Sequence, residues 1–173
     1  MAMRGRLSND LLLPVGGAFI VSTLIVALMI NLLPWSGVWL QVKPDFVALV
    51  VLYWCIHQPR KVGFTVAFSL GLIMDVAEGS VFGQHALAYS VLAYAGLVLH
   101  RRVQNFTLKG QVLHVLAILL LNDTIVLAGR MLAGGPFPGF YYFVGSFVGA
   151  ALWPVIVYLF KMPLRPAIDP DRG

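Results

Sequence analysis

The sequence predicts an all-α polytopic membrane protein, a compact bundle of about six transmembrane helices that forms one domain. The first observation is composition: 60% of the 173 residues are hydrophobic and only 11% are charged, whereas soluble domains carry about 25% charged residues. The second is the recurrence of apolar stretches separated by charged or turn-forming residues. The third is that the tails and connections are short, so any chemical function must lie within the membrane helices or at their ends.

Charge and turn residues delimit six apolar segments, at about residues 11–33, 38–56, 62–76, 83–99, 112–131 and 140–160. A helix that crosses a ~30 Å hydrocarbon core needs ~20 apolar residues, and the first, fifth and sixth segments have that length. The first is too long for the ~7–15-residue core of a secretory signal, so we expect an uncleaved membrane helix. The second is interrupted by Lys43-Pro44-Asp45. The third and fourth are short enough to thin the bilayer, lean on neighbours or re-enter.

The distribution of Lys and Arg predicts the orientation. With both termini in the cytoplasm, ten of these residues fall on the inner side, and only Lys43 and Arg130 fall on the outer side. This is the positive-inside bias of membrane proteins. It holds whether segments three and four cross or re-enter, because Arg60-Lys61 precedes the pair and Arg101-Arg102 follows it. The inner set is expected to attract anionic lipid headgroups. Topology alone accounts for the positive charge, so no nucleic-acid partner is expected.

The connection between segments three and four carries candidate metal ligands. Asp75, Glu78 and His85 have suitable side chains, but only Asp75 and Glu78 stand at a helical spacing that presents paired ligands. We therefore expect no metal here.

Turn and capping chemistry explains the same connection better. Gly79 and Gly83 supply flexible backbone, and Ser80 is expected to cap the following helix. Tyr89 continues one face of that helix as a packing seam. On this interpretation the connection is a structural corner near the outer surface that presents Asp75 to a partner.

Segment five contains Asn122-Asp123, and buried acids in membrane helices usually face protein or water. Asp123 and Arg130 are seven residues apart, which places them on one helix face about 10 Å apart along the axis. Arg130 can snorkel to the outer surface and screen the acid; otherwise Asp123 is protonated or pairs with a partner protein. An alternative function is a small-molecule or ion carrier that uses Asp123 and the Asp75 region.

Two intramembrane acids also suggest an aspartyl protease in which Asp75 and Asp123 share a proton. The residues before Asp75 read GLIM rather than a G-x-G-D type of motif, and the two acids lie at different predicted depths. The motifs H-E-x-x-H, G-x-S-x-G, the P-loop and C-x-x-C are likewise missing from the sequence. We expect no catalytic residue and no enzymatic activity.

Small residues at helical spacing predict close helix packing. Gly145 and Gly149 form a G-x-x-x-G pair in segment six, and Ala67 and Gly71 form a similar pair in segment three. Such faces let two helix backbones approach in lipid. The packing is either internal or between two copies of the chain, as in a homodimer.

A series of short motifs keeps its order and spacing along most of the chain. The motifs are Leu33-Pro34-Trp35, Lys43-Pro44-Asp45-Phe46, Leu52-Tyr53-Trp54, Pro59, Val62-Gly63, Gly71-Leu72-Ile73-Met74-Asp75, Gly79-Ser80, Gly83, Leu87-Ala88-Tyr89-Ser90, Ala93-Tyr94, Arg102-Val103-Gln104-Asn105-Phe106 and Leu152-Trp153-Pro154. Together, from about Leu33 to Pro154, they resemble the rod shape-determining membrane protein MreD family.

The resemblance implies a non-enzymatic scaffold of the bacterial elongation machinery in the cytoplasmic (inner) membrane, without a cofactor. Members of this family associate with the bitopic protein MreC. They work with the actin-like MreB filament, a RodA-type glycosyltransferase and its partner transpeptidase to direct lateral peptidoglycan synthesis and maintain rod shape. The resemblance also implies a fold like the six-helix substrate-binding components of energy-coupling vitamin transporters. The residues expected to form a partner-binding or structural signature are Pro44, Asp45, Asp75, Gly79, Ser80, Gly83, Tyr89, Asp123, Arg130, Trp153 and Pro154.

Overall fold

The computed structural model describes residues 16–37, 42–79 and 81–161, and these form six α-helices and one 3-10 helix, without a strand among them. The expected all-helical fold is confirmed. The helices are α1 (Gly17–Leu32), α3 (Phe46–His57), α4 (Phe64–Ala77), α5 (Gln84–Asn105), α6 (Leu108–Leu132), the 3-10 helix η1 (Phe140–Phe143) and α7 (Val144–Lys161).

Two stretches, α6 and the continuous run Phe140–Lys161, are long and apolar enough to cross a membrane, while α1, α3 and α4 are shorter apolar helices. The fourth predicted segment was too short. Its helix, α5, has 22 residues and continues through Arg101 and Arg102 to Asn105. The basic pair marks where the apolar surface ends, but Arg is a good helix former and does not end the helix itself.

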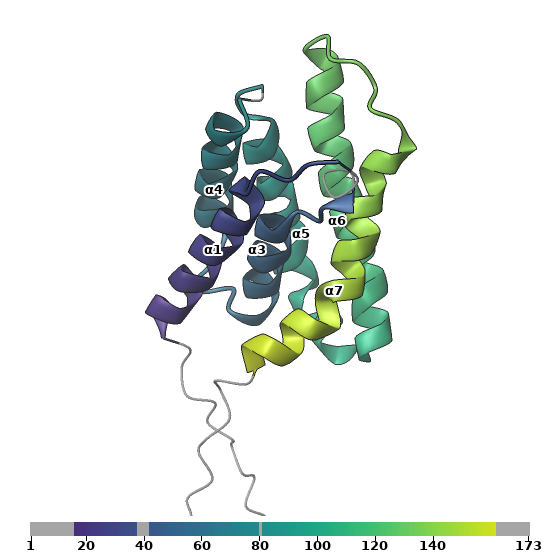
Figure 1. Ribbon diagram of the computed structural model, residues 1–173. Coiled ribbons are helices and arrows are strands. Elements are labelled where there is room, and N and C mark those ends of the chain that lie inside the picture. The colour runs from purple at the N-terminus through teal and green to yellow at the C-terminus, as the bar shows by residue number, and fades with distance from the viewer. Residues whose placement is uncertain (1–15, 38–41, 80, 162–173) are drawn as a thin grey trace, which may run out of the picture.

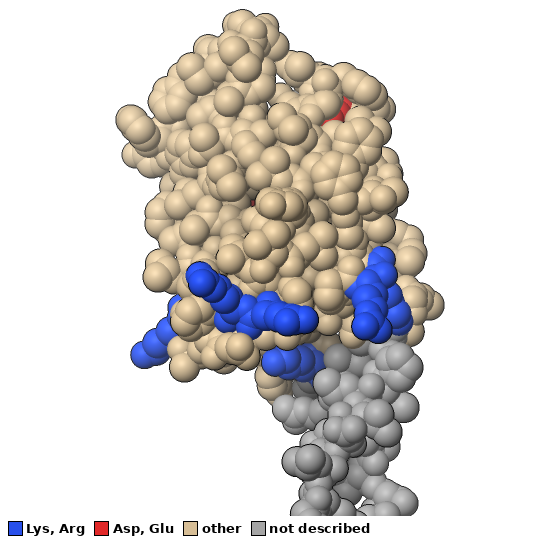
Figure 2. Space-filling model, turned by 180° about the vertical axis from the view of Figure 1, so that it is seen from behind, with Lys and Arg blue, Asp and Glu red and all other residues tan. Residues whose placement is uncertain are grey.

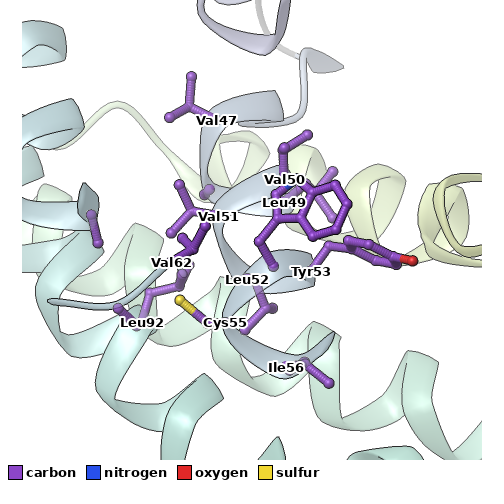
Figure 3. Close-up of a cluster of buried hydrophobic side chains, with 14 of the residues drawn as sticks. Val47, Leu49, Val50, Val51, Leu52, Tyr53, Cys55, Ile56, Val62 and Leu92 are labelled. Carbon is purple, nitrogen blue, oxygen red and sulfur yellow. The ribbon is translucent and has the colours of Figure 1, made fainter. Parts of the chain in front are cut away.

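The central element of the bundle is α3. It packs against α1, α5, α6 and α7, while α4 covers the outer side of α5, and α6 packs against both α5 and α7 (Figure 1). Every residue from Val47 to Ile56 is buried. In Figure 3 the side chains of α3 point to all sides of the helix, with Val62 and Leu92 beside them. A helix that is hydrophobic all round belongs inside a protein rather than at its surface.

Aromatic rings join α3 to α7 in one half of the bundle. Trp54 stacks on Phe160 with ring centroids 5.5 Å apart. Trp153, which is fully buried, donates from its indole nitrogen to Gln111 Oε1 at 3.2 Å and so ties α7 to α6. Pro154 lies within α7, where it lacks an N–H donor, and α7 curves along its length (Figure 1).

The two ends of the bundle differ in charge. We call the "basic end" the one where α1 begins, α3 and α5 end and α7 ends; it carries Arg60, Lys61, Arg101, Arg102, Lys109 and Lys161. Lysine and arginine side chains gather there as a band in Figure 2. The four acidic residues in the described ranges lie toward the opposite "far end" or in the half next to it: Asp45, Asp75, Glu78 and Asp123.

Glycines allow the helices to approach closely at two crossings. A Cβ atom on Gly71 of α4 would lie 2.4 Å from the Ala86 Cα of α5. One on Gly145 of α7 would lie 2.6 Å from the carbonyl oxygen of Lys43, and one on Gly149 would meet Leu119, Leu49 and Pro44. Gly145 and Gly149 are therefore packed within the chain, and their face is not a surface for a second copy.

Candidate functional site

A polar network joins three helices at the far end, centred on Asp45. Pro44 is buried just before it, and Asp45 caps α3 by accepting from the Ala48 N–H at 3.0 Å. The same Oδ1 accepts from Asn31 Nδ2 of α1 at 2.9 Å, and Oδ2 accepts from the Tyr89 hydroxyl of α5 at 2.7 Å. Asp45 therefore holds the ends of α1, α3 and α5 together.

A second carboxylate, Asp75 of α4, caps the start of α5. Its oxygens accept from the backbone N–H groups of Gly83 at 2.8 Å, His85 at 2.8 Å and Ala86 at 3.3 Å. His85 Nδ1 lies 2.9 Å from Asp75 Oδ1, and His85 Nε2 lies 3.6 Å from Glu78 Oε2. A carboxylate that accepts several N–H bonds at a helix N-terminus is stabilised there by both the bonds and the helix dipole.

The turn before α5 differs from the expected capping scheme. Ser80 lies outside the described residues. The N-cap position of α5 is Gly83, whose φ of 98° favours glycine, and Gly79 also has a positive φ of 59°. The cap comes from Asp75 instead. Asp75 is 1% exposed, which corrects the expectation that this turn presents it to a partner.

A cavity of about 450 Å³ opens beside these two carboxylate sites at the far end. Its walls come from the ends of α1 and α4, the starts of α3, α5 and α7, the far half of α6, and η1. The lining residues are Asn31, Lys43, Asp45, Met74, Glu78, His85, Leu119, Asn122, Asp123, Val126, Arg130, Pro138, Tyr141, Tyr142, Gly145 and Ser146. Asp75 is not among them.

Asp123 lies in the wall of this cavity. It accepts a hydrogen bond from the Ser146 hydroxyl of α7 through Oδ2, and Asn122 Nδ2 lies 3.5 Å from its Oδ1. Arg130 lines the same cavity, but within the described ranges no ion pair joins the two. The structure thus brings Asp45, Asp123 and Arg130 to one cavity.

The pairing of Asp75 with Asp123 that a protease needs gains no support. Both oxygens of Asp75 serve the N-terminus of α5, and only Asp123 reaches the cavity. For the hypothesis of a small-molecule or ion carrier, Asp123 remains a possible ligand-binding residue because it lines the cavity, whereas Asp75 does not line it. In the described part of the chain, no group of three His, Cys, Asp or Glu side chains is arranged to hold a metal ion.

Asn31 and Ser146 are site residues that sequence reasoning missed. Asn31 is 4% exposed and bonds both the Asp45 side chain and the Phe46 N–H. Its position in the sequence could have indicated this role, because a polar amide at the end of an apolar segment usually faces protein. Ser146 stands between Gly145 and Gly149, where the small-residue pattern hides its hydroxyl.

An apolar groove of about 440 Å³ lies on the outer face of α4 and α5, away from the cavity. It is lined by Phe64, Phe68, Leu72, Phe82, Gly83, Ala86, Leu87, Ser90, Val91 and Tyr94. The rings of Phe64 and Phe68 stack with centroids 6.3 Å apart and form one wall. Large side chains along it are exposed, among them Phe64 at 56% and Phe82 at 72%.

Comparison with known proteins identifies the family. A family model described as rod shape-determining protein MreD matches residues 15–163, a stretch that contains every described helix. A rod shape-determining protein MreD from Haemophilus influenzae is 29% identical over 142 residues, which cover 82% of this chain and 88% of that protein. No solved structure matches, so the likeness to vitamin-transporter components stays a prediction. The chain belongs to the rod shape-determining protein MreD family.

Proposed function

We propose that this chain is a multi-pass scaffold of the bacterial inner membrane that takes part in determining rod shape by binding an MreC-like bitopic protein. Through that partner it helps a RodA-type glycosyltransferase, its transpeptidase and the MreB filament to direct lateral peptidoglycan synthesis. Family membership supports the role in rod shape. In this arrangement the basic end and both termini lie in the cytoplasm, and the far end faces outward.

The observation that carries the proposal is the apolar groove on α4 and α5. It extends from Phe64, the first residue of α4 at the basic end, to Phe82, just before α5 at the far end. Its α4 wall is the apolar stripe Phe64, Phe68 and Leu72, spaced one helical turn apart, and such a stripe fits an apolar membrane helix better than a soluble peptide. A bitopic protein has one such helix, and helices associate in lipid by close packing against complementary surfaces.

Site-specific photo-crosslinking in cell membranes tests this docking. Crosslinkers placed at Phe68 and Leu87, in the groove, are expected to capture the MreC-like protein. Crosslinkers at Leu113 of α6 and Val155 of α7 serve as matched controls, because both side chains are exposed and apolar, at 66% and 58%, but lie outside the groove.

A functional variant completes the test. Phe68→Trp enlarges a side chain within the groove, and Leu113→Trp makes an even larger enlargement outside it. In a strain depleted of the native protein, we expect Phe68→Trp to lower co-purification of the MreC-like protein and to give rounded cells, while Leu113→Trp keeps rods. Equal capture from the groove and control positions, or capture of lipid alone, refutes the docking site. Rod-shaped cells after full depletion refute the proposed function.

A further inference from the structure

The far-end cavity is lined by charged side chains of both signs. Asp45, Glu78 and Asp123 contribute carboxylates, whereas Lys43 and Arg130 contribute the cationic side chains. Lys43 donates from Nζ to the backbone carbonyl near the end of α1 at 2.8 Å. His85 also lines the cavity, so carboxylates and basic side chains face one space, with Arg130 two helical turns beyond Asp123 on α6.

Two oxygen atoms in the wall have acceptor capacity that the protein leaves unused. Asn122 is 2% exposed, and its Oδ1 has no hydrogen-bond partner among the described residues. Its amide nitrogen faces Asp123 Oδ1 at 3.5 Å, so this oxygen of Asp123 receives only a long contact, while Oδ2 accepts from Ser146. A buried acceptor without a donor is unfavourable. An occupant that donates to Asp123 Oδ1, and to Asn122 Oδ1 once the buried amide turns toward the cavity, removes this penalty.

We propose that the cavity binds a zwitterionic amino-phosphate of the phosphoethanolamine class. The ammonium lies against Asp123 and Asn122, and the phosphate lies toward Arg130. A primary ammonium has three N–H donors and no acceptor, which suits one amide oxygen and one carboxylate oxygen with unused capacity, beside a second carboxylate, Asp45. A phosphate accepts paired hydrogen bonds from a guanidinium, whereas a simple cation leaves Arg130 facing like charge.

The cavity mouth is placed to receive this chemistry from either of two sources. Tyr141 of η1 lines the cavity and is 74% exposed, so η1 forms part of its rim, and exposed aromatic side chains of this kind are usual at a membrane interface. The ligand is therefore free phosphoethanolamine or the headgroup of phosphatidylethanolamine. The site is independent of partner docking, because the cavity and the α4–α5 groove share no lining residue.

Thermal stability of the purified full-length chain tests the proposal. Free phosphoethanolamine is titrated in detergent, with ethanolamine and inorganic phosphate as single-charge probes. In parallel, the chain is placed in nanodiscs of phosphatidylglycerol with or without phosphatidylethanolamine. The variants are Asp123→Asn, Asn122→Leu and Arg130→Gln. Arg102→Gln at the basic end is the matched control for the arginine change.

We expect phosphoethanolamine, or the lipid that carries it, to raise the unfolding temperature, and Asp123→Asn to weaken binding at least tenfold. Arg130→Gln, an exposed change that leaves the fold intact, is expected to weaken phosphoethanolamine binding severalfold without changing ethanolamine binding, and Arg102→Gln to change neither. Stabilisation by the lipid alone assigns the headgroup as the source. The proposal is overturned if neither form stabilises the chain, or if Arg130→Gln and Arg102→Gln behave alike. Partner crosslinking at the groove is expected to be unaffected by these variants, because the groove and the cavity share no lining residue, so the two proposals fail separately.

Discussion

Replacing Asp75 by asparagine removes a charge and one of two acceptor oxygens from the N-terminus of α5. In the native protein, Oδ2 accepts from the Gly83 and Ala86 N–H groups and Oδ1 accepts from the His85 N–H. An asparagine amide keeps one acceptor oxygen and turns an NH₂ group toward the remaining donors. At least one short hydrogen bond is therefore lost in a site where the side chain is 1% exposed.

The magnitude follows from these bonds. A buried donor left without a partner costs about 1–3 kcal/mol, and loss of the carboxylate at the helix N-terminus adds about 0.3–1 kcal/mol. Asp75→Asn is expected to lower the free energy of unfolding by about 1–4 kcal/mol. Glu78→Gln is the matched control in the same turn. Its carboxylate is 40% exposed and makes a single 3.6 Å contact with His85, so about 0.5 kcal/mol or less is expected.

Denaturant-induced unfolding in detergent micelles, followed by far-ultraviolet circular dichroism, measures both variants. Hydrogen exchange then locates the loss, which should be concentrated in the first two turns of α5. If Asp75→Asn and Glu78→Gln lose the same small free energy, the capping role assigned to Asp75 is refuted.

Two further predictions concern contacts between helices. Tyr89→Phe removes the buried hydroxyl that donates to Asp45, the cap of α3, and is expected to destabilise the fold by about 1–3 kcal/mol in the same unfolding assay. Tyr94→Phe changes a 66% exposed side chain and should leave the stability unchanged. Equal effects of the two variants would contradict a stabilising role for the Tyr89 hydroxyl. Gly71→Ala places a Cβ atom 2.4 Å from the backbone of α5 and is expected to lower the yield of folded monomer in size-exclusion chromatography severalfold. Gly63→Ala, with open space around its Cβ, should give the native yield, so a full yield from both would show that the crossing tolerates a side chain.

The helical class of this fold could be predicted from the sequence, but the limits of its helices were harder. Composition and apolar runs are enough to predict helices, because membrane segments must satisfy their backbone internally. The first and last residues of each helix depend on nearby prolines and capping side chains. The second segment was expected from residue 38, yet α3 begins at Phe46, since Pro44 disfavours the helical conformation of the residue before it and Asp45 provides the cap. Residues 38–41 lie outside the described part of the chain.

The sequence allowed the individual residues of the site to be predicted, but not which of them contact one another. Asp45, Asp75, Tyr89, Asp123 and Arg130 could all be singled out, because polar groups are rare in an apolar chain. Their partners could not, since the bond from Tyr89 to Asp45 joins residues 44 positions apart and depends on how three helices meet. The same tertiary placement separates Asp75, which serves the backbone, from Asp123, which reaches the cavity.

The burial of α3 on every side bears on how the chain is assembled during synthesis. A helix of 12 residues rises about 18 Å, well short of the ~30 Å thickness of the hydrocarbon core. It therefore cannot rest in lipid as an independent helix while the rest of the chain is made. Three of the helices that enclose it, α5, α6 and α7, follow it in the chain. The helices that surround α3 are all present only after α7 has left the ribosome, so we expect α3 to insert late and together with its neighbours rather than by itself.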